Sequence, residues 1–215
     1  HGDGVGKRVC IIANSLDFQS DVAASCARDA ELVIACDGAA SSLEGCVVPH
    51  VICGDFDSIT REEAAVRYPE AEKLHSECQD TNDLEKSIQV ALARGASHID
   101  IVCALGGRLD HSLVTLSLLE KYHREAALRV RDKSMTARVF SASEEQRILE
   151  VSPGDTISLI PRGDGATVSI SSVQSPLARE RLIPGSRGVS NKALADAVPL
   201  VVHEGVIYCI FGQQP

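Results

Sequence analysis

Two aspartates separated by one residue follow a short apolar run in the first third of the chain. The run 51–53 ends at Gly54, and Asp55 and Asp57 come directly after it. The β-branched side chains of the run predict a buried strand, and the glycine predicts a sharp turn at its end. Two carboxylates so close repel each other unless a cation lies between them, and Mg²⁺ takes carboxylate oxygens and bridges to phosphate. The pair therefore predicts a magnesium site, although solvated aspartates in a strand-end turn would give the same short motif.

Further carboxylates follow the ends of other predicted strands. Asp37 comes after a strand predicted over residues 31–36, and Asp110 comes after one predicted over residues 98–105. Asp83 lies at the start of a predicted helix. Because parallel strands end at one edge of a sheet, where open α/β sheets bind their ligands, these groups are expected to converge. The predicted metal ligands and catalytic carboxylates are Asp55, Asp57, Asp83 and Asp110.

The stretch 106–111 suits a phosphate group. Gly106 and Gly107 let backbone N–H groups approach an anion at the start of the next helix, and Arg108 adds a planar cation. His111 could hydrogen-bond a phosphate or move a proton, or its neighbours could satisfy it at the helix start. The sequence contains no Walker A motif. Carboxylates with a metal, a glycine pair and an arginine indicate phosphoryl-type transfer, in which positioning and charge neutralisation do most of the work.

A second polar stretch opens the helix that contains Asp83. Asp80 or Thr81 is its predicted N-cap, and the helix is expected to run to about Arg94. Polar side chains of this stretch are candidates for hydrogen bonds to phosphate or substrate. The full set of predicted nucleotide contacts is Asp37, Gln79, Asp80, Thr81, Lys86, Gly106, Gly107, Arg108 and His111.

The composition argues against some classes of partner. The formal net charge is -9, whereas a nucleic-acid-binding surface is basic. No apolar stretch reaches the roughly 20 residues of a membrane-spanning helix. Aromatic residues make up 3% of the chain and tryptophan is absent, so few rings are available to stack on a base or a sugar. The expected partners are therefore small molecules, with no nucleic acid and no membrane.

The chain contains 8 cysteines, most of them in apolar strand-like runs. A free cysteine in such a run behaves as a small core residue. No C-x-x-C pair occurs, so the sequence offers no framework for a zinc site. These positions predict reduced thiols and a cytoplasmic protein.

The pattern of elements predicts two domains. Strands and helices alternate over residues 8–140, which indicates an α/β domain with a mostly parallel sheet. Over residues 141–215 the helical period disappears, and short apolar runs are separated by Gly, Pro and Asp. This second pattern is typical of an all-β domain, a small sandwich or barrel. A ligand cleft between domains or between subunits is the default expectation.

The ordered set of motifs resembles the thiamine pyrophosphokinase family over nearly the whole chain. The motifs of the first domain are DGAA at 37–40, GDFDSI at 54–59, QDTNDLEK at 79–86 and LGGRLDH at 105–111. In the second domain, Pro176-Leu177 and GSRGVSN at 185–191 resemble the thiamine-binding segment of that family. No single motif is decisive, but their order and spacing are specific.

The resemblance implies a function and an assembly. It implies transfer of the terminal diphosphate of ATP to the hydroxyl of thiamine, which gives thiamine diphosphate and AMP. It implies a homodimer whose α/β domain binds ATP with Mg²⁺ and whose β-sandwich domain binds thiamine. Ser190 and Asn191 would then bind the thiamine pyrimidine. A nearby aspartate would accept the proton of the attacking alcohol.

One position departs from the family pattern. The family usually has Trp or Tyr just before the Pro-Leu pair to stack on thiamine, and this chain has Ser175. Losing such a stacking contact costs about 1–3 kcal/mol. A diphosphokinase for another heterocyclic alcohol, such as a hydroxymethylpterin, is therefore a second hypothesis. A nucleotide- or vitamin-binding sensor without catalysis is a third, although a pure binder has no need of so many metal ligands.

Overall fold

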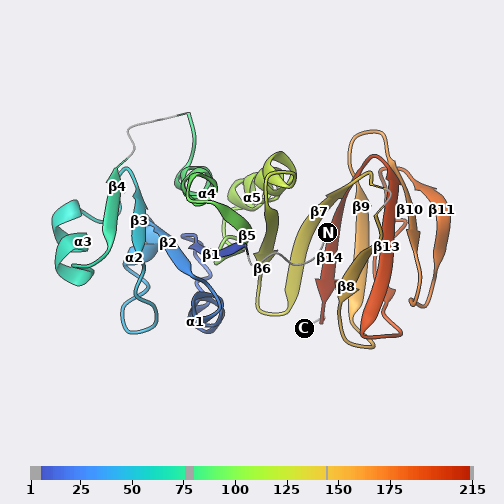
Figure 1. Ribbon diagram of the computed structural model, residues 1–215, viewed down its shortest axis with the longest axis horizontal. Coiled ribbons are helices and arrows are strands. Elements are labelled where there is room, and N and C mark those ends of the chain that lie inside the picture. Colours follow the sequence, from blue (N-terminus) through green and yellow to red (C-terminus); the bar gives the residue numbers. More distant parts are fainter. Residues whose placement is uncertain (1–5, 76–79, 144, 214–215) are drawn as a thin grey trace. The chain divides into compact units, whose positions relative to one another are not determined.

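The first half of the chain alternates strands and helices, as its apolar periodicity predicts (Figure 1). The computed structural model describes residues 6–75, 80–143 and 145–213, and the chain divides into two compact units, His1–Lys133 and Ser134–Pro215. The strands of the first unit are β1 (Lys7–Ile12), β2 (Leu32–Cys36), β3 (Val51–Gly54), β4 (Glu72–His75), β5 (Ala96–Val102) and β6 (Ala127–Arg131). Its helices are α1 (Ser20–Arg28), α2 (Asp37–Ala40), α3 (Arg61–Arg67), α4 (Asp83–Ala93) and α5 (Leu109–Tyr122).

All strands of the first unit pair in parallel, in the order β6-β5-β1-β2-β3-β4. The chain fills one side of β1 with β2 to β4 and then crosses to the other side with β5 and β6. The order therefore reverses between β1 and β5. In open α/β sheets ligands bind outside the carboxyl ends of the strands at such a switch point.

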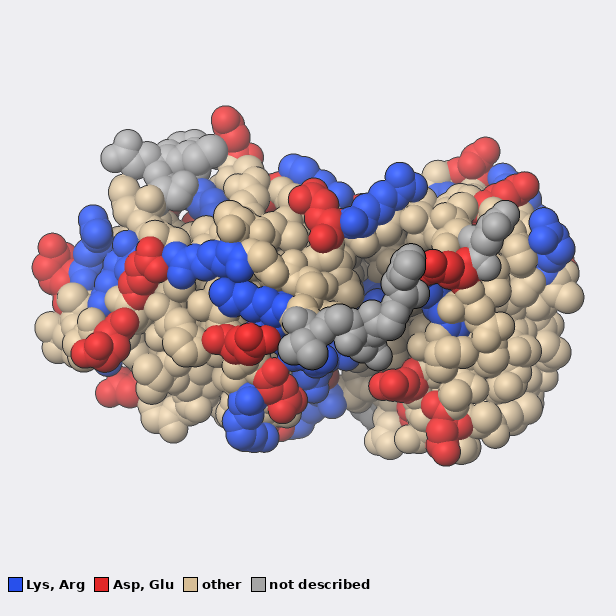
Figure 2. Space-filling model, viewed as in Figure 1, with Lys and Arg blue, Asp and Glu red and all other residues tan. Residues whose placement is uncertain are grey.

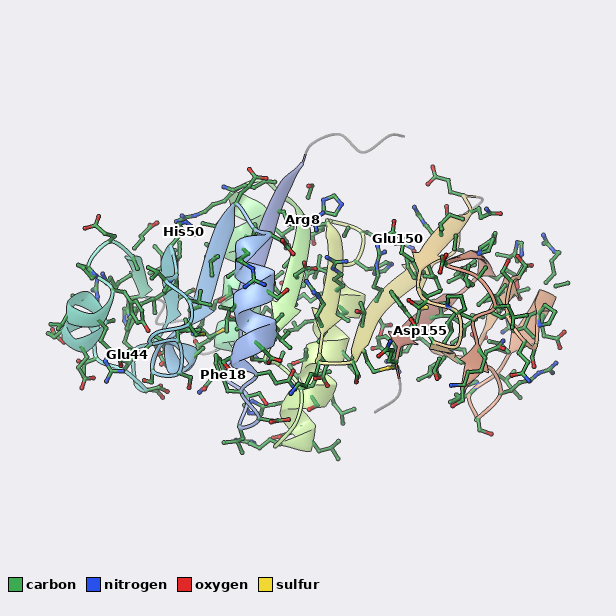
Figure 3. All side chains as sticks on the ribbon, turned by 90° about the horizontal axis from the view of Figure 1, so that it is seen from below. Arg8, Phe18, Glu44, His50, Glu150 and Asp155 are labelled. Carbon is green, nitrogen blue, oxygen red and sulfur yellow. The ribbon has the colours of Figure 1, made fainter. Side chains whose placement is uncertain are left out.

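The sheet of the first unit is covered on both faces. Neighbouring residues of a strand point to opposite faces, and Val9 to Ile12 of β1 are all fully buried. Ile12 belongs to a core cluster that includes α1, and Phe18 packs against that cluster from the segment before α1 (Figure 3). Helix α4 packs against β2, β3 and β5. The strands that lead to the polar edge of the sheet are thus buried between helices.

The second unit is built from two antiparallel sheets. Its strands are β7 (Met135–Ser141), β8 (Arg147–Glu150), β9 (Thr156–Pro161), β10 (Ala166–Ile170), β11 (Leu177–Leu182), β12 (Asn191–Lys192), β13 (Ala197–Glu204) and β14 (Val206–Gly212). The strand orders are β12-β9-β14-β7 and β11-β10-β13-β8. One buried cluster joins side chains of both sheets, among them Leu159 of β9 and Leu200 of β13. The second unit is thus rich in strands, as the sequence pattern predicts, and its two sheets share one core.

The strand that follows the first unit explains where the two units divide. The sequence pattern predicts a boundary after residue 140, whereas the two units divide between Lys133 and Ser134. Strand β7 pairs antiparallel with β14 along its whole length, from Met135↔Gly212 to Ser141↔Val206. This pairing ties residues 135–141 to the second unit.

The start of helix α4 differs from its prediction. The predicted N-cap was Asp80 or Thr81, which is wrong. The helix begins at Asp83, and the side chain of Asn82 accepts a hydrogen bond from the Glu85 N–H at 2.9 Å. Asparagine suits this position because its short side-chain oxygen reaches the free N–H groups of the first turn.

Three observations bear on the environment of the chain. Within the described ranges, no helix combines the length and apolar character needed to span a membrane. The cysteines that the structure describes, all except Cys78, are free thiols. On the visible face of the first unit, acidic and basic side chains are interspersed (Figure 2).

Candidate functional site

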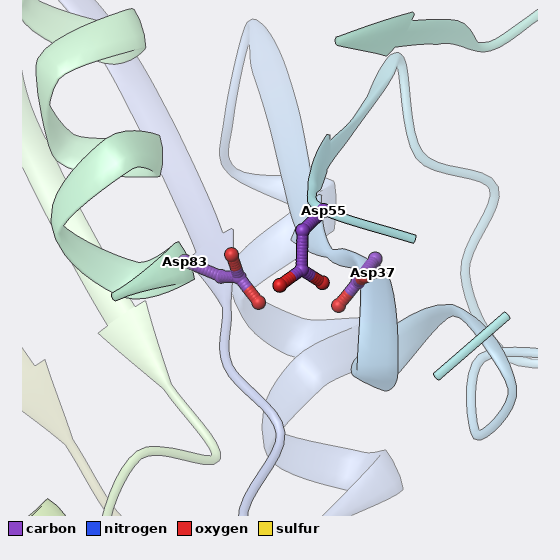
Figure 4. Close-up of side chains that lie close together, drawn as sticks. All are labelled: Asp37, Asp55 and Asp83. Carbon is purple, nitrogen blue, oxygen red and sulfur yellow. The ribbon is translucent and has the colours of Figure 1, made fainter. Parts of the chain in front are cut away.

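Three carboxylates meet at the carboxyl edge of the parallel sheet. Asp37 directly follows β2, Asp55 directly follows β3, and Asp83 is the first residue of α4. One oxygen of each lies within 4.8 Å of the others (Figure 4). Hard oxygen donors at this spacing suit a divalent cation such as Mg²⁺. We call these residues the carboxylate trio.

Asp37 is the most constrained member of the carboxylate trio. It is only 1% exposed, and its carboxylate accepts hydrogen bonds from the Gly38 N–H at 2.5 Å and the Phe56 N–H at 2.6 Å. Burial, together with the negative charge of Asp83, raises the pKa of Asp37 to about 6, although the two hydrogen bonds act in the opposite direction. Burial and the neighbouring carboxylates thus disfavour the charged form of Asp37.

Close approach explains the glycine that ends β3. A Cβ atom on Gly54 would lie 2.5 Å from Cγ of Asp37, which no side chain can tolerate without a shift. The next residues form a tight turn in which Phe56 adopts a left-handed conformation, with φ at 62°. Gly54 therefore leaves room for the buried carboxylate between β2 and β3.

Asp83 has a cationic neighbour on its own helix. The Nζ atom of Lys86 lies 3.3 Å from Oδ1 of Asp83, and the Lys86 side chain is only 7% exposed. A buried lysine is normally paired, because an isolated buried charge is costly. Lys86, a predicted nucleotide contact, thus lies beside the carboxylate trio.

Asp57 lies next to the carboxylate trio but is not part of it. Its side chain is exposed and accepts a hydrogen bond from the Ser58 hydroxyl at 3.0 Å. Its backbone N–H donates to Oδ1 of Asp55 at 3.2 Å. In the structure, this N–H helps to orient Asp55.

Asp110 lies in a separate cluster at the start of α5. Its carboxylate pairs with the guanidinium of Arg108, with Nη2 2.5 Å from Oδ2, and both side chains are more than 60% exposed. The hydrogen bond from Arg108 lowers the pKa of Asp110 to about 2. The preceding Gly106 and Gly107 both have positive φ, 87° and 71°, a region that favours glycine. Asp110 is therefore paired with a cation in its own cluster, the guanidinium of Arg108.

A cavity of about 260 Å³ connects these two clusters. It is lined by Ala13, Asn14, Ser15, Leu16, Cys36, Asp37, Ser58, Asn82, Asp83, Leu84, Ala104, Gly106, Arg108, His111 and Thr115. The lining includes the loops after β1 and β5, which flank the switch point of the sheet. The Ser15 hydroxyl ties them together by donating to the Leu105 carbonyl oxygen at 2.5 Å.

The loop after β1 was missed by the sequence prediction. Asn14, Ser15 and Leu16 all line the cavity, although their residue types carry no recognisable motif. The available signal was the abrupt end of the strand at Ile12, followed by polar residues. That signal identifies a site only when β1 is known to neighbour β5.

The remaining predicted contacts of the first unit are less well placed. Gln79 lies outside the described residues. Asp80 is exposed and Thr81 is half-buried, both in the segment before α4. His111 is exposed, lines the cavity and donates its backbone N–H to Asp110 Oδ1 at 3.0 Å.

In the second unit, the side chain of Asn191 is engaged by the main chain of Ser175. Its Oδ1 accepts from the Ser175 N–H at 3.0 Å, and its Nδ2 donates to the Ser175 carbonyl oxygen at 2.7 Å. Ser190 has a left-handed backbone, with φ at 61°, and its N–H donates to the Ser158 hydroxyl at 3.0 Å. The geometry shows Asn191 fixing the segment around residue 175.

Comparisons with known proteins agree on one family. Residues 23–130 match the family described as "Thiamin pyrophosphokinase, catalytic domain". "Thiamin pyrophosphokinase 1" of Caenorhabditis elegans is 38% identical over 80 residues, which are 34% of this chain and 32% of that protein. "Thiamine pyrophosphokinase" of Bacillus subtilis (strain 168) is 32% identical over 110 residues, 50% of this chain and 51% of that protein. These matches thus span about a third and about half of the curated relatives.

Solved structures resemble nearly the whole chain. The crystal structure of thiamine pyrophosphokinase from Bacillus subtilis has a TM-score of 0.84 at 23% identity, covering 97% of this chain and 100% of that one. Thiamin pyrophosphokinase from Candida albicans has a TM-score of 0.81 at 14% identity, covering 97% and 90%. At these identities the likeness shows the shared fold.

Proposed function

The chain belongs to the thiamine pyrophosphokinase family, and from this premise we propose that it transfers the diphosphate group of ATP to the hydroxyl of thiamine. The products are thiamine diphosphate and AMP. One observation carries the proposal, namely that Asp37 and Asp83 of the carboxylate trio line the same cavity as Arg108 and His111. Acidic metal ligands and cationic groups around one cavity suit a metal–nucleotide complex.

The donor set of the carboxylate trio fits Mg²⁺. Its members are oxygen ligands, and the raised pKa of Asp37 reflects burial and the charge of Asp83 beside it. We propose that Asp37, Asp55 and Asp83 hold the metal and that Asp57 and Asp110 contribute directly or through water. When bound, Mg²⁺ would neutralise the charge of the phosphates.

Groups of the chain itself would position the nucleotide. We propose that Arg108 and the backbone of Gly106 and Gly107 bind phosphate oxygens, helped by the helix start at Leu109. His111 would hydrogen-bond the transferred group from the same cavity wall. The other proposed nucleotide contacts are Gln79, Asp80, Thr81 and Lys86.

The acceptor must lose a proton when its oxygen attacks phosphorus. A carboxylate of the site is the natural proton acceptor, because it can lie within hydrogen-bond reach of the alcohol. We propose that Ser190 and Asn191 contribute to binding the thiamine pyrimidine. The side chain of Asn191 bonds the main chain of Ser175 and accepts from the Lys192 N–H, so its contribution includes holding the segment around residue 175 in place.

One assay tests the proposal against its alternatives. Purified protein is incubated with ATP, Mg²⁺ and thiamine, and AMP and thiamine diphosphate are followed by chromatography. Equal amounts of both products are expected. Because Ser175 stands where a stacking ring is usual, a hydroxymethylpterin is tested in parallel. AMP formed with the pterin but not with thiamine would support a diphosphokinase for another heterocyclic alcohol. Nucleotide binding without any AMP formation would support a sensor without catalysis.

Two broader expectations also belong to this proposal. We propose a homodimer, which light scattering of the purified protein would detect as twice the chain mass. We also propose a cytoplasmic location, in keeping with the free thiols of the described cysteines. A monomer with full activity would contradict the first of these.

A further inference from the structure

Ser87 is a fully buried hydroxyl directly beneath the carboxylate trio. It lies one helical turn after Asp83 on α4 and is 0% exposed. Its hydroxyl donates to the Asp83 carbonyl oxygen at 2.8 Å. Serine often makes this local bond inside a helix, so the bond alone indicates no special role. The other contacts of Ser87 are more informative.

A buried thiol brings Ser87 into contact with the neighbouring strand β2. The Cys36 Sγ atom lies 3.6 Å from the Ser87 Oγ atom. Cys36 and Cys53 are 4% and 2% exposed and are direct partners in the parallel pairing of β2 with β3. The serine side chain therefore contacts β2 as well as its own helix, and β2 pairs with β3 at this position.

These contacts lie directly behind the three carboxylates. Cys36 is followed by Asp37, and Cys53 is separated from Asp55 only by Gly54. Asp83 is held through its own carbonyl group. Ser87 thus links α4 directly to β2, and through the pairing of Cys36 with Cys53 to β3. These are the three elements that carry the carboxylate trio.

The arrangement opposes an electrostatic force. One oxygen of each of these three carboxylates lies within 4.8 Å of the others, so mutual repulsion tends to separate α4 from β2 and β3. A network of buried hydrogen bonds resists such a separation, because an unpaired buried hydroxyl is costly. We propose that Ser87 is a positioning residue that sets the spacing of Asp37, Asp55 and Asp83 and thereby the affinity of the site for a divalent cation. This inference rests on the metal role in the proposed function.

Mn²⁺ binding tests the proposal without any turnover. Mn²⁺ suits the same carboxylate ligands as Mg²⁺, and the free ion is counted directly by electron paramagnetic resonance. Ser87→Ala is expected to weaken Mn²⁺ binding about 10-fold, the usual effect of removing a group that orients metal ligands. Ser117→Ala, an exposed serine of α5, is the matched control and should bind Mn²⁺ like the unmodified protein.

Variants of Cys36 separate positioning from simple packing. Cys36→Ser keeps a polar partner for Ser87 and should retain Mn²⁺ affinity, whereas Cys36→Ala should weaken it. The double variant Ser87→Ala/Cys36→Ala should bind no more weakly than the weaker single variant, because both changes break one network. Unchanged Mn²⁺ affinity in Ser87→Ala, with only a lower melting temperature, would overturn the proposal.

The outcomes distinguish this proposal from the proposed function. A protein that binds Mn²⁺ but does not convert thiamine, and whose Ser87→Ala variant binds Mn²⁺ more weakly, would keep the positioning role and refute the enzyme activity. If the unmodified protein converts thiamine, and if it and Ser87→Ala bind Mn²⁺ with equal affinity, the enzyme activity is kept and the positioning role is refuted. Absence of Mn²⁺ binding to the unmodified protein would overturn the positioning role.

Discussion

Asp37 and Asp110 each follow a strand of the same parallel sheet, but their surroundings are opposite. Asp37 is buried and lies beside two other carboxylates, which raises its pKa to about 6. Asp110 is exposed and paired with Arg108, which lowers its pKa to about 2. Burial and neighbouring carboxylates therefore disfavour the charge of Asp37, whereas Arg108 stabilises the charge of Asp110.

The contrast shows how one residue type can serve two purposes at one edge of a sheet. Repulsion within the carboxylate trio is a cost that a bound cation would remove, so these residues suit metal binding. The Arg108–Asp110 pair keeps a guanidinium oriented at the start of α5, where we propose that phosphate binds. The sequence predicts Asp110 as a metal ligand together with Asp55, Asp57 and Asp83, because each follows a strand or opens a helix.

The largest effect is expected from removing one charge of the carboxylate trio. Asp55→Asn should lower diphosphate transfer by at least about 100-fold, since it removes a proposed metal ligand. Its melting temperature should stay the same or rise, because Asp55 repels Asp37. Activity and thermal unfolding are measured side by side. Asp196→Asn, an exposed aspartate of the second unit, is the control and should leave both unchanged. Near-normal activity in Asp55→Asn would remove Asp55 from the metal site.

A smaller loss is expected from displacing Asp37 while keeping its charge. In Gly54→Ala the new Cβ atom would lie 2.5 Å from Cγ of Asp37, so the carboxylate must move. Turnover should fall by up to about 100-fold, and the free energy of unfolding by about 1–3 kcal/mol. Gly45→Ala is the control, because nothing lies within 4 Å of its Cβ position and only its positive φ is unfavourable. If Gly54→Ala were as active as Gly45→Ala, the exact place of Asp37 would not matter.

The pH dependence of stability should differ between the two carboxylates. Asp37 has a folded-state pKa of about 6, above the ordinary value of roughly 4, so it binds its proton more tightly when folded. Its contribution to stability is therefore largest below pH 4 and is lost as the pH rises through 6. Asp110, with a pKa of about 2, contributes stability above pH 4 that is lost as the pH falls towards 2.

Chemical denaturation at a series of pH values, in buffers that contain a chelator, measures how the free energy of unfolding changes with pH in these two intervals. Asp37→Asn should flatten the fall in the free energy of unfolding between about pH 4 and pH 6. Asp110→Asn should leave that interval unchanged and flatten the loss below pH 4. Equal slopes in Asp37→Asn and the unmodified protein would mean that Asp37 is charged in the folded state without penalty.

The smallest effect is expected from the exposed pair. Asp110→Asn at pH 7 should lower the melting temperature only slightly, because surface ion pairs in water contribute little. Salt should have no larger effect on the variant than on the unmodified protein. A clear loss of stability would show that Asp110 is more than a partner of Arg108.

Much of the parallel sheet could be predicted from the sequence. Strands β2 and β3 are continuous apolar runs that stop at aspartate or glycine, and β2, β3 and β5 lie within a few residues of the ranges predicted for them. Strands β8 and β11 carry charged, exposed residues, as in the sequence of β11, LARERL, and give a weaker apolar signal. An edge strand exposed on one side carries no continuous apolar signal.

The composition of the carboxylate trio could not be read from the sequence. Asp37 was expected beside the nucleotide, and the structure places it within 4.8 Å of Asp55 and Asp83. That closeness follows from the pairing of Cys36 with Cys53, since the residues after two paired positions emerge side by side. Register is a property of the sheet, and no spacing along the chain encodes it.

The bond pattern between Asn191 and Ser175 has a consequence for how this family can vary. Asn191 holds only the main-chain N–H and carbonyl oxygen of residue 175, so any L-amino acid except proline could keep both bonds. The identity of the side chain at 175 is therefore uncoupled from the path of the backbone. Evolution, or a protein engineer, can exchange that side chain without rebuilding the segment that presents it.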